Sequence, residues 1–261
     1  MVFSALNALF LVLSAPLSSH GVAVNHFNLG ARALAALGGG VPLRIMPLGA
    51  SITWGQASSD GNGYRDALRT QLTSAGNPVN MVGSRQHGNM RDNDVEGWPG
   101  FRIEQVHQKA ATSVPQWKPN VILVNAGTND ALQNKNISSA GERMESMLND
   151  LYGWSPRAVI FLSTLIVNRN GNAERDAVAI NVQLTSVAQK LQAAGRRLLL
   201  VNMRGDTGPQ LGDLADDTHP SDVGYRKMAN IWLTALLEAS DAGFLQRPEA
   251  ASISIPDDGG S

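Results

Sequence analysis

Short apolar runs alternate with longer amphipathic segments along most of this chain, and this alternation is the feature that most constrains its fold. The apolar runs predict five strands, at residues 43–48, 79–82, 121–124, 158–162 and 197–201. Apolar positions at helical spacing predict helices at about residues 64–75, 101–113, 140–152, 172–194 and 221–236. Parallel strands are joined by crossovers, which are nearly always helices. We therefore expect an α/β protein, a three-layer α/β/α sandwich with a five-stranded parallel sheet.

Polar residues mark several boundaries between these elements. Asn62 suits the cap of the first helix, and Ser139 with Glu142 has the form of a capping box before the third. A polar loop is expected over residues 84–100. With 261 residues, 43% of them hydrophobic, the chain is long enough for one large domain with a sizeable core.

The two ends of the chain differ from this central region. Residues 2–17 carry no charge, and Gly21-Val22-Ala23 supplies small residues suited to a signal peptidase, so residues 1–23 are predicted to be a signal peptide and the protein to be secreted. An apolar helix packed on the domain is the alternative; a membrane anchor is disfavoured because the stretch is short and contains Pro16. Residues 24–42 are expected to lead into a domain at residues 43–240, and residues 241–261 to form a tail.

Charge and composition exclude several function classes. The formal net charge is -1 and the basic residues are scattered, so we expect no nucleic-acid partner. The chain has no cysteine, which excludes disulfides and thiolate catalysis. An acidic group in the last third lacks a recognisable calcium or zinc spacing, so we expect no metal and no cofactor. That group comprises Asp206, Asp213, Asp216, Asp217 and Asp222. The mature protein is expected to be a monomer that acts away from membranes on a small-molecule or polysaccharide substrate.

Three residues with catalytic potential follow three of the predicted strands. Ser51 comes after the first strand in a turn flanked by glycines, Gly83 after the second, and Asn129 after the third. In open parallel sheets, ligands bind beyond the carboxyl ends of the strands. The three residues are therefore predicted to meet at one edge of the sheet.

A histidine near the end of the chain is the best candidate for a general base. Of the five histidines, His219 directly precedes the last predicted helix, and Asp216 lies three residues upstream. A serine hydroxyl becomes a nucleophile when an imidazole takes its proton, and a carboxylate fixes the tautomer of that imidazole. The developing oxyanion needs preorganised donors, which the N–H groups of Ser51 and Gly83 and the side-chain amide of Asn129 would supply.

These residues together resemble the blocks of the SGNH hydrolases, a branch of the GDSL esterases and lipases. The blocks are Gly49-Ala50-Ser51, Gly83, Gly127-Thr128-Asn129-Asp130 and the segment from Asp216 to His219. The resemblance implies a flavodoxin-like fold, Ser51 as nucleophile, His219 as base, Asp216 as its orienter, and an oxyanion hole of Ser51, Gly83 and Asn129. Taken singly, each block also suits an ordinary turn; their order along the chain favours the catalytic interpretation.

Further segments resemble the acetylxylan esterases of carbohydrate esterase family three. They are Arg44-Ile45-Met46-Pro47-Leu48-Gly49, Gly63-Tyr64-Arg65, Val82-Gly83-Ser84 and Glu96-Gly97-Trp98-Pro99-Gly100. The SGNH family usually has Gly-Asp-Ser, whereas this chain has Ala50 in place of the aspartate, so other bonds must hold the turn. Trp54, Trp98 and Phe101 are candidates for an apolar wall against which a sugar ring packs.

The sequence therefore predicts a serine esterase that deacetylates a carbohydrate such as acetylated xylan through an acyl-enzyme. A lipase, lysophospholipase or thioesterase on the same fold is the first alternative, disfavoured by the polar loop at residues 84–100 and the absence of a long apolar lid. An inactive carbohydrate-binding module is the second, motivated by Ala50.

Overall fold

A mostly parallel sheet forms the centre of the computed structural model, which describes residues 35–254. The signal peptide predicted at residues 1–23 therefore lies outside the described residues. The sheet has seven strands in the order β3-β4-β1-β5-β6-β7, with β2 paired to β1. The strands are β1 (Leu43–Gly49), β2 (Val79–Met81), β3 (Arg85–Gln86), β4 (Asp94–Gly97), β5 (Val121–Asn125), β6 (Val159–Ser163) and β7 (Leu198–Val201).

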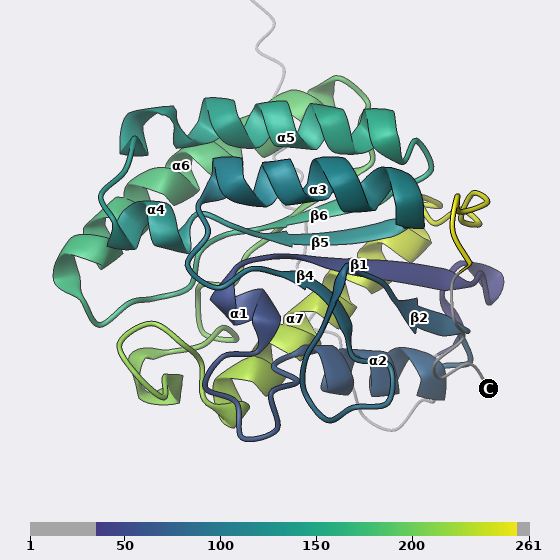
Figure 1. Cartoon of the computed structure of the whole chain (residues 1–261), viewed down its shortest axis with the longest axis horizontal. Helices are drawn as coiled ribbons and strands as arrows, with labels where there is room; N and C mark the ends of the chain where they lie inside the picture. The colour runs from purple at the N-terminus through teal and green to yellow at the C-terminus, as the bar shows by residue number, and fades with distance from the viewer. Residues whose placement is uncertain (1–34, 255–261) are drawn as a thin grey trace, which may run out of the picture. The chain divides into compact units, whose positions relative to one another are not determined.

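Helices cover both faces of this sheet. Figure 1 shows α3 and α5 on one face, with α6 beside them, and α2 and α7 on the other. Two short helices, α1 and α4, follow the carboxyl ends of β1 and β5. The helices are α1 (Ser51–Trp54), α2 (Arg65–Ser74), α3 (Ile103–Trp117), α4 (Thr128–Leu132), α5 (Ala140–Trp154), α6 (Gly171–Ala193) and α7 (Asp222–Asp241), with short 3-10 helices at Leu37–Gly39, Ile137–Ser139 and Leu211–Asp213. The predicted α/β/α sandwich is confirmed.

The core consists of two layers separated by the sheet. Along β5, Val121 and Leu123 pack into the layer with α2 and α7, while Ile122 and Val124 pack into the layer with α3, α5 and α6. Successive side chains of a strand point to opposite faces, so an apolar run without alternation serves both layers. This explains why the buried strands could be predicted from their uniform hydrophobicity.

The region predicted as a polar loop at residues 84–100 instead contributes β3 and β4. Strand β4 pairs in parallel with the end of β1, and β3 pairs antiparallel with β4, which makes the sheet seven-stranded rather than five-stranded. Glu96 lies on β4 and is fully buried. Its carboxylate accepts hydrogen bonds from Ser84 N–H, the Ser84 hydroxyl and Trp98 Nε1. These bonds offset the cost of burying a polar group, which local hydrophobicity alone does not reveal.

Two of the predicted helix caps are wrong. Asn62 does not cap α2, whose N-cap is Tyr64, because the Asn62 side-chain oxygen accepts from Met90 N–H instead. The longest helix, predicted at residues 172–194, spans Gly171–Ala193 and is capped by the side chain of Asn170. The capping box predicted at Ser139 is wrong: no backbone N–H of α5 donates to this side chain, and its hydroxyl donates to the carbonyl of Asn136. The 3-10 turn that precedes α5 holds Ser139 outside the extended conformation that a capping residue needs.

The chain on either side of residues 43–240 also packs on the domain. Leu37 is buried in the core, and its N–H donates to the side chain of Asn77. Beyond α7, the carbonyl of Gln246 accepts from the side chain of Asn120, and that of Glu249 accepts from Arg44. Residues 37–42 of the expected lead-in and the expected tail up to Ser252, whose N–H donates to the carbonyl of Gln116, therefore make hydrogen bonds to the domain.

Candidate active site

Ser51 begins α1 directly after the carboxyl end of β1. The preceding glycine, Gly49, permits close packing there, because a Cβ atom on it would lie 2.2 Å from the carbonyl oxygen of Asn125. Ala50, which stands in place of an aspartate, is buried, and backbone bonds hold the turn. The Trp54 N–H donates to the Ala50 carbonyl at 2.9 Å, and the Gln56 N–H to the Ser51 carbonyl at 3.0 Å. The turn therefore keeps its shape without a carboxylate at position 50.

His219 reaches Ser51 from the loop that precedes α7. Its Nε2 lies 2.9 Å from Ser51 Oγ, and its Nδ1 lies 2.7 Å from Asp216 Oδ2. A carboxylate can only accept, so the ring proton sits on Nδ1 and Nε2 accepts from the serine hydroxyl. The structure thus joins the three residues that the sequence predicted as nucleophile, base and orienter in one hydrogen-bonded series.

Asp216 is held in place by its own backbone neighbours as well as by the imidazole. Its Oδ1 accepts from the N–H groups of Thr218 and His219, at 2.8 and 2.7 Å. Partial burial raises the pKa of this carboxyl, but the hydrogen bonds from His219 and Thr218 outweigh it, so the pKa lies below its ordinary value. The side chain of Asp216 remains 52% exposed, whereas that of His219 is only 12% exposed.

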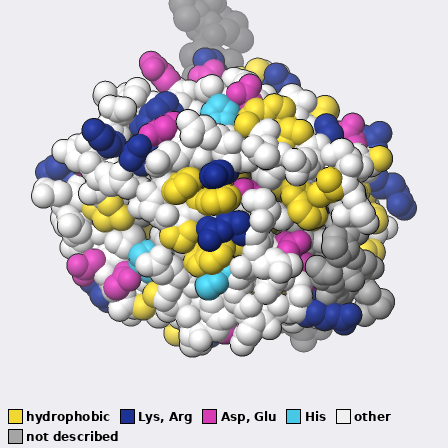
Figure 2. All heavy atoms as spheres, viewed as in Figure 1, with side chains coloured by type: hydrophobic (Ala, Val, Ile, Leu, Met, Phe, Trp, Pro, Cys, Tyr) yellow, Lys and Arg dark blue, Asp and Glu magenta, His cyan; other side chains and the backbone are white. Residues whose placement is uncertain are grey.

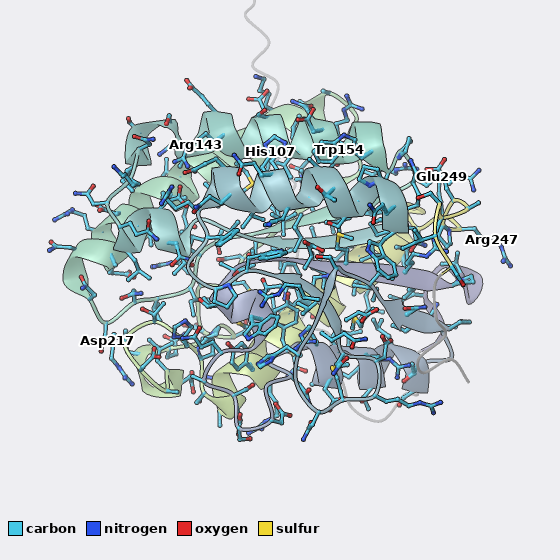
Figure 3. All side chains as sticks on the ribbon, viewed as in Figure 1. His107, Arg143, Trp154, Asp217, Arg247 and Glu249 are labelled. Atoms are coloured by element: carbon cyan, nitrogen blue, oxygen red, sulfur yellow. The ribbon has the colours of Figure 1, made fainter. Side chains whose placement is uncertain are left out.

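The loop that presents His219 is anchored at both ends. The carbonyl of His219 accepts from Ala215 N–H, and the Thr218 hydroxyl accepts from the side chain of Asn168. Ser221 caps α7 by accepting from the N–H of Gly224. Asp217, by contrast, is exposed at the edge of the molecule, opposite the labelled Arg247 and Glu249 (Figure 3). The loop therefore orients one of its two adjacent carboxylates toward the imidazole.

Asn129 lies on α4, just beyond the carboxyl end of the neighbouring strand β5. Its side chain is nearly buried, and one N–H of its amide donates to the carbonyl of Phe101 at 3.0 Å. A primary amide has a second N–H, which leaves one donor for a ligand. The next residue, Asp130, fixes α4 by accepting from Ile103 N–H and from the guanidinium of Arg143. Burial nevertheless raises the pKa of Asp130.

The structure does not bring Gly83, the predicted oxyanion donor, to the serine turn. The preceding residue, Val82, donates its N–H to Ile45 in the first half of β1. A Cβ atom on Gly83 would lie 2.2 Å from the carbonyl carbon of Val95, so the backbone of β4 packs directly against this glycine. The edge of β1 nearest Ser51 is occupied by β4.

Gly97, at the end of β4, lies where Gly83 was expected. It pairs with Gly49 at the end of β1, and a Cβ atom on it would lie 2.8 Å from the backbone nitrogen of Trp54 in α1. The following N–H, of Trp98, donates to the carbonyl of Gly49 at 3.0 Å. The sequence of the segment Glu96-Gly97-Trp98-Pro99-Gly100 already resembled the carbohydrate esterases, but strand β4 was not predicted.

The aromatic residues predicted to contact a sugar are covered by neighbouring side chains. The ring of Trp54 stacks on His87 with centroids 4.0 Å apart, and the guanidinium carbon of Arg85 lies 4.0 Å from the Trp54 centroid. Trp98 lies 4.6 Å from the same guanidinium and 4.2 Å from the ammonium of Lys109, and it also stacks on Phe101. The ring faces of Trp54 and Trp98 are therefore occupied by protein groups.

The described residues contain no group of three or more His, Cys, Asp or Glu side chains arranged to hold a metal ion. Over the same range, no helix is long and apolar enough to span a membrane.

Comparisons with known proteins agree with this geometry. The chain is 27% identical over 242 residues to a multidomain esterase of Ruminococcus flavefaciens; the match covers 80% of this chain but 31% of that protein. Among solved structures, a Clostridium thermocellum family 3 carbohydrate esterase is 26% identical, with a TM-score of 0.69 over 77% of this chain and 98% of that one. A family 3 carbohydrate esterase from Talaromyces cellulolyticus shares the fold, at 23% identity and a TM-score of 0.67, over 77% and 99%. The family model for the GDSL-like lipases and acylhydrolases matches residues 48–227, and the chain belongs to that family.

Proposed function

We propose that this protein is a serine esterase that removes acetyl groups from a carbohydrate. The observation that carries the proposal is the continuous hydrogen-bonded series from Asp216 through His219 to Ser51, with distances of 2.7 and 2.9 Å. Such a series activates a hydroxyl that is otherwise a weak nucleophile at neutral pH. It assembles in the presence of Ala50, which speaks against the alternative of an inactive binding module.

The reaction proceeds through an acyl-enzyme. Ser51 Oγ bonds to the ester carbonyl carbon as its proton passes to Nε2 of His219, and the tetrahedral intermediate collapses when the sugar oxygen leaves with that proton. Water then gives a proton to His219 and attacks the acyl carbon, and acetic acid, which ionises to acetate in solution, leaves as Ser51 regains its hydrogen. Asp216 stays ionised throughout and stabilises the imidazolium.

The oxyanion of each tetrahedral intermediate is stabilised by donors around the serine turn. We assign these to the N–H of Ser51, in the first turn of α1 where N–H groups lack helical partners, the second amide N–H of Asn129, and the N–H of Gly97 in place of Gly83. Each donor of this kind lowers the barrier by about 3 kcal/mol.

A carbohydrate acetate is favoured as substrate for two reasons. The Clostridium thermocellum structure that resembles this chain over 77% of its length is a carbohydrate esterase. In addition, the segment predicted as a polar loop and found to contain β3 and β4 places charged and polar side chains beside the serine turn, where a long acyl chain would need an apolar surface.

Hydrolysis of p-nitrophenyl esters from acetate to laurate, and of acetylated xylan, tests the proposal. The wild type is expected to prefer acetate, and Ser51→Ala to lose about 10⁴-fold or more of the activity. Ser186→Ala, which removes an exposed hydroxyl on α6, serves as the matched control. Equal activity of wild type and Ser51→Ala would overturn the proposal, and a preference for laurate would favour a lipase.

A further inference from the structure

Five side chains beside the serine turn form one stack, which we call the cation ladder: His87, Trp54, Arg85, Trp98 and Lys109. His87 and the guanidinium of Arg85 both lie 4.0 Å from the centre of the Trp54 ring, so they must occupy opposite faces of it. Arg85 and Lys109 both contact the Trp98 ring. Figure 2 shows the result at the centre of this face, where hydrophobic side chains alternate with Lys and Arg side chains above a histidine.

The ladder is built from separate elements, and hydrogen bonds fix two of its members. Trp54 comes from α1, Arg85 from β3 and Lys109 from α3. Trp98 is fixed by its indole N–H, which donates to the buried carboxylate of Glu96 at 2.7 Å. One N–H of Arg85 donates to the carbonyl of Gly97 at 2.9 Å. Because the Arg85 side chain is already held by this bond, a ligand that binds Arg85 loses little additional side-chain entropy.

The two cations of the ladder keep their bonding capacity. Within residues 35–254, neither Arg85 nor Lys109 has an ion-pair partner, and the bond to Gly97 is the one hydrogen bond that the Arg85 guanidinium makes. A guanidinium carries five donors, in a fork that matches a carboxylate. The nearby carboxylate of Glu96 is engaged on both oxygens by Ser84 and Trp98. The stack therefore presents two cations that have no ion-pair partner among the described residues.

The ladder is close to the atoms that react. Trp54 follows Ser51 by three residues on α1, which is a rise of about 4.5 Å along the helix axis. Trp98 follows Gly97, and its N–H donates to the carbonyl of Gly49. Phe101, which stacks on Trp98, accepts the hydrogen bond from Asn129. A polymer whose ester lies at Ser51 would thus carry its neighbouring units across the ladder.

From this arrangement we infer that the cation ladder binds a carboxylate on the substrate, so that the preferred substrate is an acetylated polysaccharide containing uronic acid units. This inference rests on the proposed esterase function and specifies its substrate class. The tryptophan faces are occupied and cannot stack on a neutral sugar, whereas Arg85 and Lys109 each keep charged donors for an anion.

The test compares two acetylated xylo-oligosaccharides that differ only in one uronic acid side group. The readout is the ratio of kcat/KM for the acidic to the neutral oligosaccharide, so a general change in activity cancels. Wild type is expected to give a ratio of about ten, and the double variant Arg85→Gln with Lys109→Gln a ratio near one. Arg247→Gln changes an exposed arginine at the right-hand edge of the molecule in Figure 3 and should leave the ratio at the wild-type value. Salt should lower the wild-type ratio, because it screens exposed charges.

The outcomes separate the inference from the function on which it rests. Ser51-dependent hydrolysis of p-nitrophenyl acetate with a wild-type ratio near one overturns the carboxylate site and leaves the esterase intact. A ratio near ten that persists in the double variant also overturns it. If no ester is hydrolysed, the proposed function fails. The ladder can then still be tested by calorimetric binding of the unacetylated acidic oligosaccharide. Binding that is lost in the double variant supports the ladder as a carboxylate site, and an absence of binding to the wild type overturns it.

Discussion

The Nε2 atom of His219 lies 2.9 Å from the Oγ atom of Ser51, although 168 residues separate the two in the chain. The serine is fixed by the end of β1 and the start of α1, and the histidine by the loop before α7. Neither residue shares an element with the other, so the contact depends on the packing of the whole domain.

Asp216→Asn is expected to lower kcat by about 10²-fold to 10⁴-fold, the upper figure applying to a buried carboxylate. An amide offers one accepting oxygen where Asp216 uses two, and it favours the wrong tautomer of His219. Asp217→Asn makes the same charge change one residue away on an exposed side chain and should retain wild-type kcat. Steady-state hydrolysis of p-nitrophenyl acetate measures both; equal losses in the two variants would contradict the assigned role.

Asn129→Ala is expected to lower kcat by about 10²-fold to 10³-fold with little change in KM, since an oxyanion donor acts mainly in the transition state. The variant also leaves the carbonyl of Phe101 without its 3.0 Å hydrogen bond, so urea denaturation should be measured in parallel. A rise in KM at constant kcat would instead indicate that Asn129 only binds substrate.

Gly97→Ala is expected to lower turnover, whereas Gly83→Ala is expected to lower stability. A methyl group on Gly97 would press on the backbone of Trp54 in α1, so we expect fewer turnovers per active serine. A methyl group on Gly83 would press on Val95 in β4, so we expect a lower Tm but near-normal turnover per active serine. Titration with a fluorophosphonate counts active serines, and thermal unfolding reports stability. The opposite pattern would indicate that Gly83, and not Gly97, is the oxyanion donor.

The environment of His87 is expected to lower the stability of the folded protein in mild acid. Burial, with the charges of Arg65 and Arg85, lowers the pKa of His87, so in the folded protein this ring resists protonation. As pH falls below about 6.5, the unfolded chain binds a proton that the folded chain does not, and the free energy of unfolding decreases until pH reaches the folded pKa. His87→Phe keeps the stack on Trp54 without this proton. As the pH falls from 7.5 to 5, the free energy of unfolding of His87→Phe, measured by urea denaturation, should rise relative to that of the wild type. A difference that stays constant with pH would contradict the prediction.

The central part of the fold was predictable because buried parallel strands and amphipathic helices have distinct local patterns. The uniform hydrophobicity of residues 121–124 is an example, since both faces of this strand are covered. Strands β3 and β4 were missed because they are short and polar. The buried Glu96 is stable only through bonds from Ser84 and Trp98, and that environment is a property of tertiary structure.

The candidate site was also predictable in part, where its residues lie next to elements that the sequence predicts. Ser51, Asn129 and His219 follow or precede predicted elements, and the structure brings Ser51 and His219 together as expected. Gly83 was predicted because it follows a strand; sequence order did not reveal that β4 inserts between this glycine and the end of β1. The cations that cover Trp54 and Trp98 could not be predicted from the sequence either, because they come from other elements of the fold.

The long separation of nucleophile and base also has a consequence during synthesis. Ser51 and the strands around it leave the ribosome well before His219, and at about 5–20 residues per second the interval is on the order of ten to thirty seconds. Throughout that interval the serine lacks the base that activates it. A nascent chain is therefore expected to stay catalytically silent until α7, which packs beside α2, has docked and carried His219 into place.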